Sequence, residues 1–273
     1  MDSDEDLAAE MEKMGPWHHR IEMREGLFTG SSVQVDPTGS PVTYIDTAQS
    51  FETSIKHVLP DGMEGRSFLD CACNCGGYSF AAKDRGASKV FGFDIRDHWI
   101  DQAKFVQDHR SADSSGMVFE TADLLDLPGR DEKFDVSWFS GIFYHLPDPV
   151  AGLKLAADNT KELIFLNTAC MRQDGEDEAR PGLVYKLEGT EQLMTGVYGL
   201  SWLPTGPKVL SGILAWLGFP ETRVYHWVER PGENSQGRAF HARIALVGAR
   251  ERGRLENVPT MRAPLMRGEP EGG

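Results

Sequence analysis

The sequence predicts an α/β protein with a Rossmann-like, doubly wound sheet that is mostly parallel, ends in an antiparallel hairpin and carries helices on both faces. Three observations support this fold class. Strand-like and helix-like runs alternate from Ser67 to Thr168, as in parallel sheets covered by crossover helices. An apolar run ends in an acid and a turn of small residues, Asp70 to Gly77, and such a turn opens a nucleotide-sized crevice. Near the C-terminus a short polar segment joins two long strand-like runs, which suits antiparallel neighbours.

Residues 1–60 are expected to cover the sheet. Residues 1–14 have helical spacing of apolar side chains, Ser3 can cap this helix and Pro16 ends it. A second helix is expected at residues 51–59. The region could be a solvated face that packs on the sheet, but its aromatic and Met-rich composition favours a lid that excludes water from a site. The apolar underside of that lid would comprise Met11, Met14, Trp17 and Phe28.

Residues 61–250 are expected to form the binding domain, and residues 251–273, which mix charge, Pro and Gly without periodicity, a disordered tail. A polar loop and an insertion occupy residues 169–205. The expected strands cover residues 68–70, 89–94, 117–124, 133–141, 162–168, 222–228 and 239–247, and the expected helices cover residues 78–85, 98–107, 150–160 and 208–217.

The overall charge constrains the partners. The 273 residues carry a formal net charge of −14, and no long Lys/Arg run is present. Nucleic-acid binders usually present a basic patch to the phosphates, so this charge makes a tRNA substrate less favoured without excluding it. No apolar run is long enough to cross a bilayer and no charged-then-apolar leader is visible. We therefore expect a cytoplasmic protein that binds no membrane.

Three cysteines, Cys71, Cys73 and Cys75, alternate in the small-residue turn. Alternate residues of an extended segment face the same side, so the three thiols could converge on a metal. However, zinc ligands are usually spaced two to four residues apart, which this pattern is not. The preferred interpretation is three small buried thiols, with no metal and, in a reducing compartment, no disulfide.

Acidic residues follow the successive strands. Asp94 lies roughly 20 residues beyond the turn, where dinucleotide-type folds place the carboxylate that binds ribose hydroxyls. It could instead cap the following helix. Asp123 ends the next strand run and could be a simple turn residue. The turn itself departs from a G-x-G-x-G pattern, because the three glycine positions are Ala72, Asn74 and Gly76.

This series of motifs resembles the class I S-adenosylmethionine-dependent methyltransferases. It is most similar to the subgroup with a D-x-[GA]-C-N-x-G turn and a Y-H-L segment after the fourth strand, here Tyr144 to Leu146. That subgroup includes enzymes similar to the tRNA wobble-uridine carboxymethyltransferase and many small-molecule and glycan methyltransferases. The resemblance covers about residues 15–250. It implies S-adenosylmethionine as the cofactor, with Asp70 helping to order the turn and the cofactor's amino group, and Asp123 binding the adenine amino group. The cofactor-binding residues would be Asp70, Ala72, Asn74, Gly76, Asp94, Ile95, Asp123, Leu124 and Ser140.

Catalytic and acceptor-binding residues are expected at the same edge of the sheet. His145 could act as a general base, because imidazole titrates near neutral pH, with Tyr144 beside it. The Tyr-His-Leu-Pro segment could equally be a structural support for the next helix. Tyr185 and Trp202, in the acceptor-side insertion at residues 169–205, could line the acceptor pocket or shield a cation with their rings.

The leading functional hypothesis is methyl transfer from S-adenosylmethionine to a small molecule, in specialised metabolism or glycan modification. Three alternatives stay open. The enzyme could modify tRNA. It could attack another sulfonium carbon, by aminocarboxypropyl transfer or by cyclisation to azetidine-2-carboxylate with release of methylthioadenosine. Finally, it could bind the cofactor without catalysis. The sequence does not indicate the oligomeric state.

Overall fold

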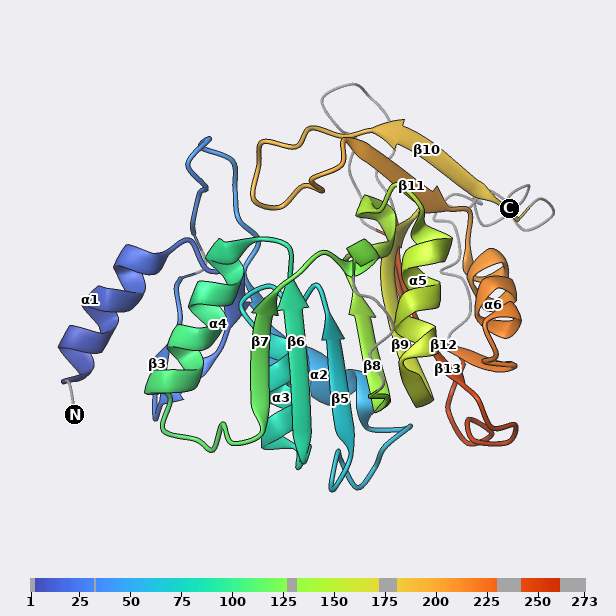
Figure 1. Cartoon of the computed structure of the whole chain (residues 1–273), viewed down its shortest axis with the longest axis horizontal. Helices are drawn as coiled ribbons and strands as arrows, with labels where there is room; N and C mark the ends of the chain where they lie inside the picture. The colour runs from blue at the N-terminus through green and yellow to red at the C-terminus, as the bar shows by residue number, and fades with distance from the viewer. Residues whose placement is uncertain (1–2, 32, 127–131, 172–180, 230–241, 261–273) are drawn as a thin grey trace, which may run out of the picture.

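A seven-stranded sheet forms the centre of the computed structural model, which describes residues 3–31, 33–126, 132–171, 181–229 and 242–260 (Figure 1). The strand order is β12-β13-β9-β8-β5-β6-β7. The five strands from β9 to β7 are parallel, and β13 and β12 are antiparallel to their neighbours. This arrangement confirms the predicted fold class. The strands are β5 (Ser67–Cys71), β6 (Lys89–Asp94), β7 (Met117–Thr121), β8 (Phe134–Ser140), β9 (Thr160–Cys170), β12 (Glu221–Glu229) and β13 (Ala242–Ala249).

The order of the strands creates a crevice beside β5. The chain runs outward from β5 to β6 and β7, then returns to the other side of β5 as β8 and continues to β9. The loops that leave β5 and β8 therefore diverge. In open α/β sheets, ligands bind at such a switch point, outside the carboxyl ends of the strands.

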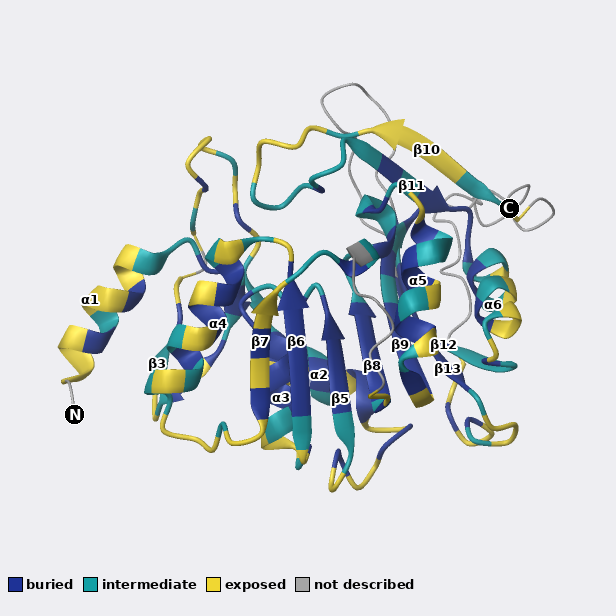
Figure 2. Cartoon of the chain, in the orientation of Figure 1, coloured by how far each residue is buried: buried dark blue, intermediate teal, exposed yellow. Residues whose placement is uncertain are grey.

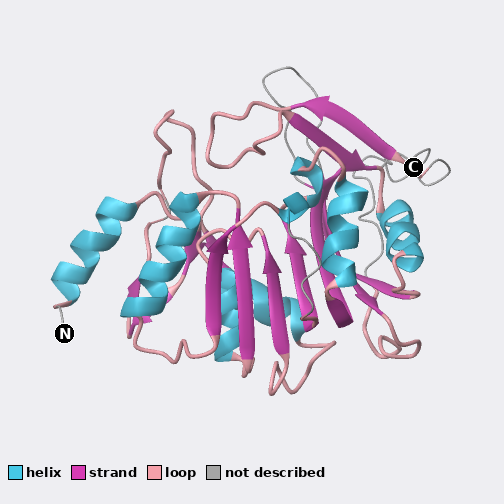
Figure 3. Ribbon diagram, viewed as in Figure 1, coloured by secondary structure: helices cyan, strands magenta, loops and turns pink. Residues whose placement is uncertain are grey.

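Helices cover both faces of the sheet (Figure 3). Side chains of α1 (Asp4–Met14), α2 (Thr47–Ile55), α3 (Gly77–Asp84) and α4 (Asp97–His109) share one buried cluster, whereas those of α5 (Pro149–Asp158) and α6 (Pro207–Trp216) share the other. The helix expected at residues 51–59 begins and ends four residues earlier, because the Asp46 carboxylate accepts a hydrogen bond from the Gln49 amide and caps it. Ser3 caps α1 as expected.

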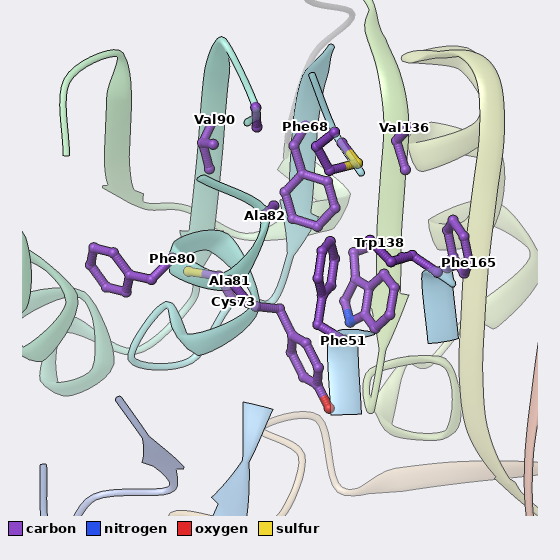
Figure 4. Packing of buried hydrophobic residues seen from close by; sticks show 14 of the residues in the cluster. Phe51, Phe68, Cys73, Phe80, Ala81, Ala82, Val90, Val136, Trp138 and Phe165 are labelled. Carbon is purple, nitrogen blue, oxygen red and sulfur yellow. The ribbon is translucent and has the colours of Figure 1, made fainter. Parts of the chain in front are cut away.

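Aromatic packing fills the face covered by α1–α4 (Figure 4). The rings of Phe51 and Trp138 lie 5.2 Å apart and those of Phe51 and Phe68 lie 5.8 Å apart. Phe68 belongs to this cluster, while its neighbour Leu69 belongs to the opposite one. Successive side chains of a strand point to opposite faces of the sheet, so β5 contributes side chains to both cores. The same alternation sets the direction of the next side chain, Asp70.

The N-terminal cover packs against α4. The Gln102 side-chain amide donates hydrogen bonds to the carbonyl oxygens of Met14 and Pro16, and Met11 and Trp17 are buried in the core. The cover contains β1 (His19–Arg20), β2 (Glu22–Arg24), β3 (Leu27–Phe28) and β4 (Ile45–Asp46), with β1 paired to β4 and β2 to β3.

The insertion contributes a separate antiparallel pair, β10 (Leu183–Leu187) and β11 (Leu200–Pro204), beyond the carboxyl edge of the sheet (Figure 1). Figure 2 shows that β10 is largely exposed. Most of the polar loop expected at residues 172–181 lies outside the described residues. Two short 3₁₀ turns, η1 (Leu124–Asp126) and η2 (Phe143–His145), follow β7 and β8.

The predicted disordered tail begins too early. Residues 251–260 form successive turns, and Leu255 and Val258 are buried in the core. Because the segment is mostly polar, the sequence did not indicate that these two apolar side chains would be buried. Residues 261–273 lie outside the described part of the chain. None of the helices that the structure describes is long and apolar enough to cross a membrane.

Candidate active site

A cavity of about 550 Å³ lies at the carboxyl edge of the parallel strands. Its volume falls within the usual range for small-molecule sites. Loops after β5, β6, β7 and β8 form its floor, and residues 193–198 of the insertion line another wall. Of the predicted site residues, the cavity is lined by Asp70, Ala72, Asn74, Asp94, Ile95, Asp123, Leu124, Ser140, Tyr144 and His145.

The small-residue turn adopts left-handed backbone conformations at all three expected glycine positions. The φ angles are +55° at Ala72, +53° at Asn74 and +80° at Gly76. Glycine takes this conformation freely, whereas Ala carries a steric cost. Asn tolerates it better, and here its side-chain oxygen accepts a hydrogen bond from the Cys75 amide at 2.8 Å. The chain thus keeps the geometry of a glycine-rich turn without its glycines.

Gly76 lies outside the cavity lining. A Cβ there would lie 3.0 Å from the Phe119 ring and 3.1 Å from the Phe80 ring. Its observed role is therefore to let the start of α3 approach the core.

Asp94 is buried at the end of β6. Its two oxygens accept hydrogen bonds from the backbone amides of Asn74 and Arg96, each at 3.0 Å. Burial raises the pKa of this carboxyl, and the amide hydrogen bonds oppose the shift. Each carboxylate oxygen has a second lone pair, so Asp94 can still accept hydrogen bonds from a ligand in the cavity.

Asp70 is buried at the end of β5 and accepts a hydrogen bond from the Ser79 hydroxyl at 2.7 Å. Desolvation raises its pKa to about 7, against the stabilising hydrogen bonds from Ser79. This carboxyl therefore ties the turn to α3 and titrates near neutral pH.

Asp123 accepts hydrogen bonds from the Leu125 amide at 2.8 Å and from the Tyr198 hydroxyl. The first bond is the turn role that the sequence allowed. The second links the acid after β7 to the insertion, which no local pattern predicts. Leu124 is buried beside it and Ile95 is partly exposed at the rim.

His145 forms a hydrogen-bonded pair with Glu188. The His145 Nδ1 and Glu188 Oε2 atoms lie 2.7 Å apart, and both side chains are largely buried. The Tyr144 ring lies against the His145 ring, with 4.0 Å between their centroids and an angle of 44° between their planes. His145 lines the cavity whereas Glu188 does not, so the carboxylate lies behind the imidazole.

Arg243 places a cation in the same cavity. It lies at the start of β13, where its Nε donates to the Asn167 side-chain oxygen on β9 at 3.0 Å, and its guanidinium carbon lies 5.8 Å from the centre of the Tyr144 ring. In the part of the chain that the structure describes, no carboxylate forms an ion pair with it. Neither Arg243 nor Asn167 belongs to a recognisable motif.

His18 and His19 line the cavity from the N-terminal cover. Burial lowers the pKa of His18 to about 4, and it holds the pKa of His19 well below the usual range. The neutral His19 accepts a hydrogen bond from the Gly77 amide at 3.1 Å and so caps α3. By contrast, the apolar residues expected beneath a lid, Met11, Met14, Trp17 and Phe28, do not line this cavity.

The structure places Tyr185 and Trp202 outside the cavity lining. They are paired across β10 and β11, with ring centroids 5.6 Å apart. The Trp202 indole donates to the Pro147 carbonyl at 3.0 Å, and Tyr185 is 64% exposed. The sequence placed both residues in an acceptor-side insertion but did not indicate which way their side chains point.

The three cysteines of the turn are buried and do not converge. Cys71 packs in the cluster under α5 and α6, whereas Cys73 and Cys75 pack in the opposite one, because the chain turns sharply after β5. Burial raises the pKa of Cys75 to about 12 and also raises those of Cys71 and Cys73 well above the usual range. Among the described residues, no group of three or more His, Cys, Asp or Glu is arranged to hold a metal.

Comparison with known proteins agrees with this geometry. Residues 63–189 match a family model described as a methyltransferase domain. The tRNA U34 carboxymethyltransferase of Campylobacter hominis is 35% identical over 118 residues, which are 42% of this chain and 40% of that protein. That of Aliarcobacter butzleri is 31% identical over 118 residues, 42% of this chain and 37% of that protein. The chain thus spans less than half the length of these curated relatives.

Solved structures share the fold. The N-terminal domain of EvdMO1, crystallised with S-adenosylhomocysteine and D-fucose, superposes with a TM-score of 0.68 at 22% identity, over 91% of this chain and 97% of that one. Magnesium protoporphyrin IX methyltransferase from Synechocystis PCC 6803, with S-adenosylmethionine bound, gives 0.50 at 16% identity, over 75% and 79%.

The seven-stranded fold and the crevice beside β5 define a methyltransferase architecture, and residues 63–189 match that family. Residues 63–189, just under half of the chain, match the methyltransferase domain, and the fold is shared with a solved methyltransferase that has S-adenosylmethionine bound, in agreement with the motifs. S-adenosylmethionine is the cofactor of this family.

Proposed function

We propose that this protein is a cytoplasmic enzyme that transfers the methyl group of S-adenosylmethionine to a small-molecule acceptor. The observation that carries the proposal is the division of the cavity along the sheet. Asp94 ends β6 and Asp123 follows β7 on one side of β5, whereas on the other side Tyr144 follows β8, and Asn167 and Arg243 belong to β9 and β13. A cofactor held by the acids would therefore direct its reactive end toward the second group.

The cofactor-holding residues fit their proposed roles. The Asp94 carboxylate has lone pairs for two ribose hydroxyls, and Asp123 and Leu124 form the wall where an adenine would lie. The turn at Ala72 and Asn74 brings backbone close to the ligand, because no large side chain intervenes. Asp70 is available to an ammonium group, which would favour its ionised form.

The cofactor supplies an activated methyl sulfonium, so the protein must chiefly orient the acceptor and exclude water. The Tyr144 ring and residues 193–198 enclose the acceptor end. His145 is the candidate base for an acceptor that must lose a proton. In this arrangement the acceptor must be small, because the cofactor takes much of the 550 Å³.

Product analysis tests the proposal. The purified protein is incubated with S-adenosylmethionine and, separately, with sugars, phenols and amines. Acceptor-dependent formation of S-adenosylhomocysteine, lost in Asp94→Ala, is expected. Methylthioadenosine would indicate attack on the aminobutyrate chain or ring closure instead. Binding without any turnover would indicate a cofactor-binding protein.

Carboxymethyl transfer to RNA is a second candidate, and two observations favour it. The curated relatives are named tRNA U34 carboxymethyltransferases. In addition, a transferred carboxymethyl group carries a carboxylate, for which the Arg243 guanidinium beside Tyr144, which has no carboxylate partner among the described residues, is suitable. The formal net charge of −14 argues against the RNA acceptor.

Two measurements separate the candidates. S-adenosylmethionine that bears a carboxylate on its methyl carbon should bind no tighter than the ordinary cofactor if methyl is transferred. Tighter binding, lost in Arg243→Gln, would favour carboxymethyl transfer. A gel shift with tRNA should show no submicromolar, salt-sensitive complex at physiological ionic strength, and such a complex would favour the RNA acceptor.

A further inference from the structure

Glu188 is a buried carboxylate that none of the roles above uses. Its side chain is only 11% exposed and that of His145 17%. A buried carboxylate needs hydrogen-bond partners to offset the loss of water. Among the described residues, Glu188 accepts hydrogen bonds from Nδ1 of His145 at 2.7 Å and the amide of Gly196 at 3.2 Å, and the Arg96 guanidinium interacts with it electrostatically.

The backbone around the pair leaves no room for adjustment. A Cβ at Gly196 would lie 2.9 Å from Glu188 Oε2, 2.9 Å from His145 Cβ and 3.1 Å from His145 Nδ1. The Glu188 amide also donates to the Gly199 carbonyl at 3.0 Å. Glycine at 196 therefore lets the insertion close over the histidine and keep the carboxylate 2.7 Å from Nδ1.

The chemistry of this contact determines the proton positions. An ionised carboxylate can only accept hydrogen bonds, so a neutral His145 must carry its proton on Nδ1. The lone pair then lies on Nε2, at the far side of the ring from Glu188. Since the cavity is lined by His145 and not by Glu188, Nε2 is the atom available to an acceptor.

We propose that Glu188 is a positioning residue that fixes His145 as the Nδ1–H tautomer and stabilises its imidazolium form, and that the acceptor atom is a hydroxyl oxygen. This inference rests on the proposed methyl transfer. The O–H bond of the acceptor breaks and its proton moves to Nε2. The oxygen electron pair forms the bond to the methyl carbon, and the electrons of the broken C–S bond remain on sulfur as a neutral thioether. An amine acceptor would need no such base–carboxylate pair.

The tautomer is tested without knowledge of the acceptor. In the full chain with ¹⁵N-labelled histidine, long-range ¹H–¹⁵N spectra identify the tautomer of His145, assigned by the signal lost in His145→Gln. The wild type is expected to show the Nδ1–H form. Glu188→Ala should lose this preference, whereas Glu191→Ala, an exposed acid of the same insertion, should retain it. Unchanged affinity for S-adenosylhomocysteine shows that each variant is folded.

The kinetic arm uses the hydroxyl compound that gives turnover in the product analysis. Glu188→Gln keeps the size of the side chain and removes its charge, so it also serves if Glu188→Ala does not fold. We expect kcat to fall roughly 10–100-fold with little change in KM. Glu191→Gln should leave both kcat and KM unchanged.

An Nε2–H tautomer in the wild type, or a Glu188→Gln enzyme with an unaltered kcat, would overturn the inference. Turnover of amines but not of hydroxyl compounds would also overturn it. If no acceptor class yields S-adenosylhomocysteine while the tautomer is as expected, the proposed methyl transfer fails and the role of Glu188 in orienting His145 stands.

Discussion

Replacing Ala72 by glycine should stabilise the protein, although it removes a side chain. Ala72 has a φ of +55°, and a left-handed conformation costs a residue with a Cβ roughly 1–2 kcal/mol. Glycine removes that cost but makes the unfolded chain more flexible, which offsets about 0.4–1 kcal/mol. The net gain should be roughly 0.5–1 kcal/mol, or about 1–3 °C in Tm for a chain of this length.

Thermal and urea unfolding of matched variants measure this gain. Ala215→Gly removes the same atoms from an exposed position of α6 and should lower stability by roughly 0.5–1 kcal/mol. Asn74→Gly should be close to neutral, because it relieves the φ of +53° but loses the side-chain hydrogen bond to the Cys75 amide. A lower Tm for Ala72→Gly than for the wild type would refute the steric reasoning.

Three other predictions concern the cofactor site. Asp94→Ala should weaken S-adenosylhomocysteine binding by roughly 2–4 kcal/mol in calorimetry, because two charge-assisted hydrogen bonds are lost; equal affinities would remove the proposed ribose contact. The raised pKa of Asp70, about 7 against 3.8, means that the folded protein retains a proton that the unfolded chain releases. Asp70 should therefore make stability fall, by up to about 4 kcal/mol, as pH rises from about 4 to about 7; urea unfolding of Asp70→Asn should lack this part of the slope, and an identical slope would contradict it. S-adenosylhomocysteine should increase the hydrogen-exchange protection of residues 3–30, whereas unchanged protection would make them a permanently packed cover.

The strands and the cofactor half of the site could be predicted because each depends on a short, continuous stretch of sequence. The strand expected at residues 89–94 is β6 without change, since an apolar run flanked by polar residues has one stable placement. Once the strands are placed, the positions of the acid at the end of β6 and of the acid after β7 are fixed. Left-handed φ angles at Ala72 and Asn74 were not predictable from residue preference, because neither residue favours this conformation as strongly as glycine does.

The acceptor half could not be predicted, because its side chains meet only in three dimensions. Glu188 and His145 are separated by 43 residues and Arg243 and Asn167 by 76. Their contacts depend on how β10 and β11 turn over the sheet and on the register of β13 against β9. The same dependence explains why Tyr185 and Trp202, chosen for their aromatic character, lie outside the cavity.

The hydrogen bond between Tyr198 and Asp123 has a consequence for the order of events at the site. It joins the insertion to the acid expected beside the adenine. An adenine amino group that arrives at Asp123 must share this carboxylate with the Tyr198 hydroxyl or displace it. Loading of the cofactor would then alter how residues 193–198 sit over the acceptor end. Such an exchange would make binding sequential, with the nucleoside entering before the molecule that receives its methyl group.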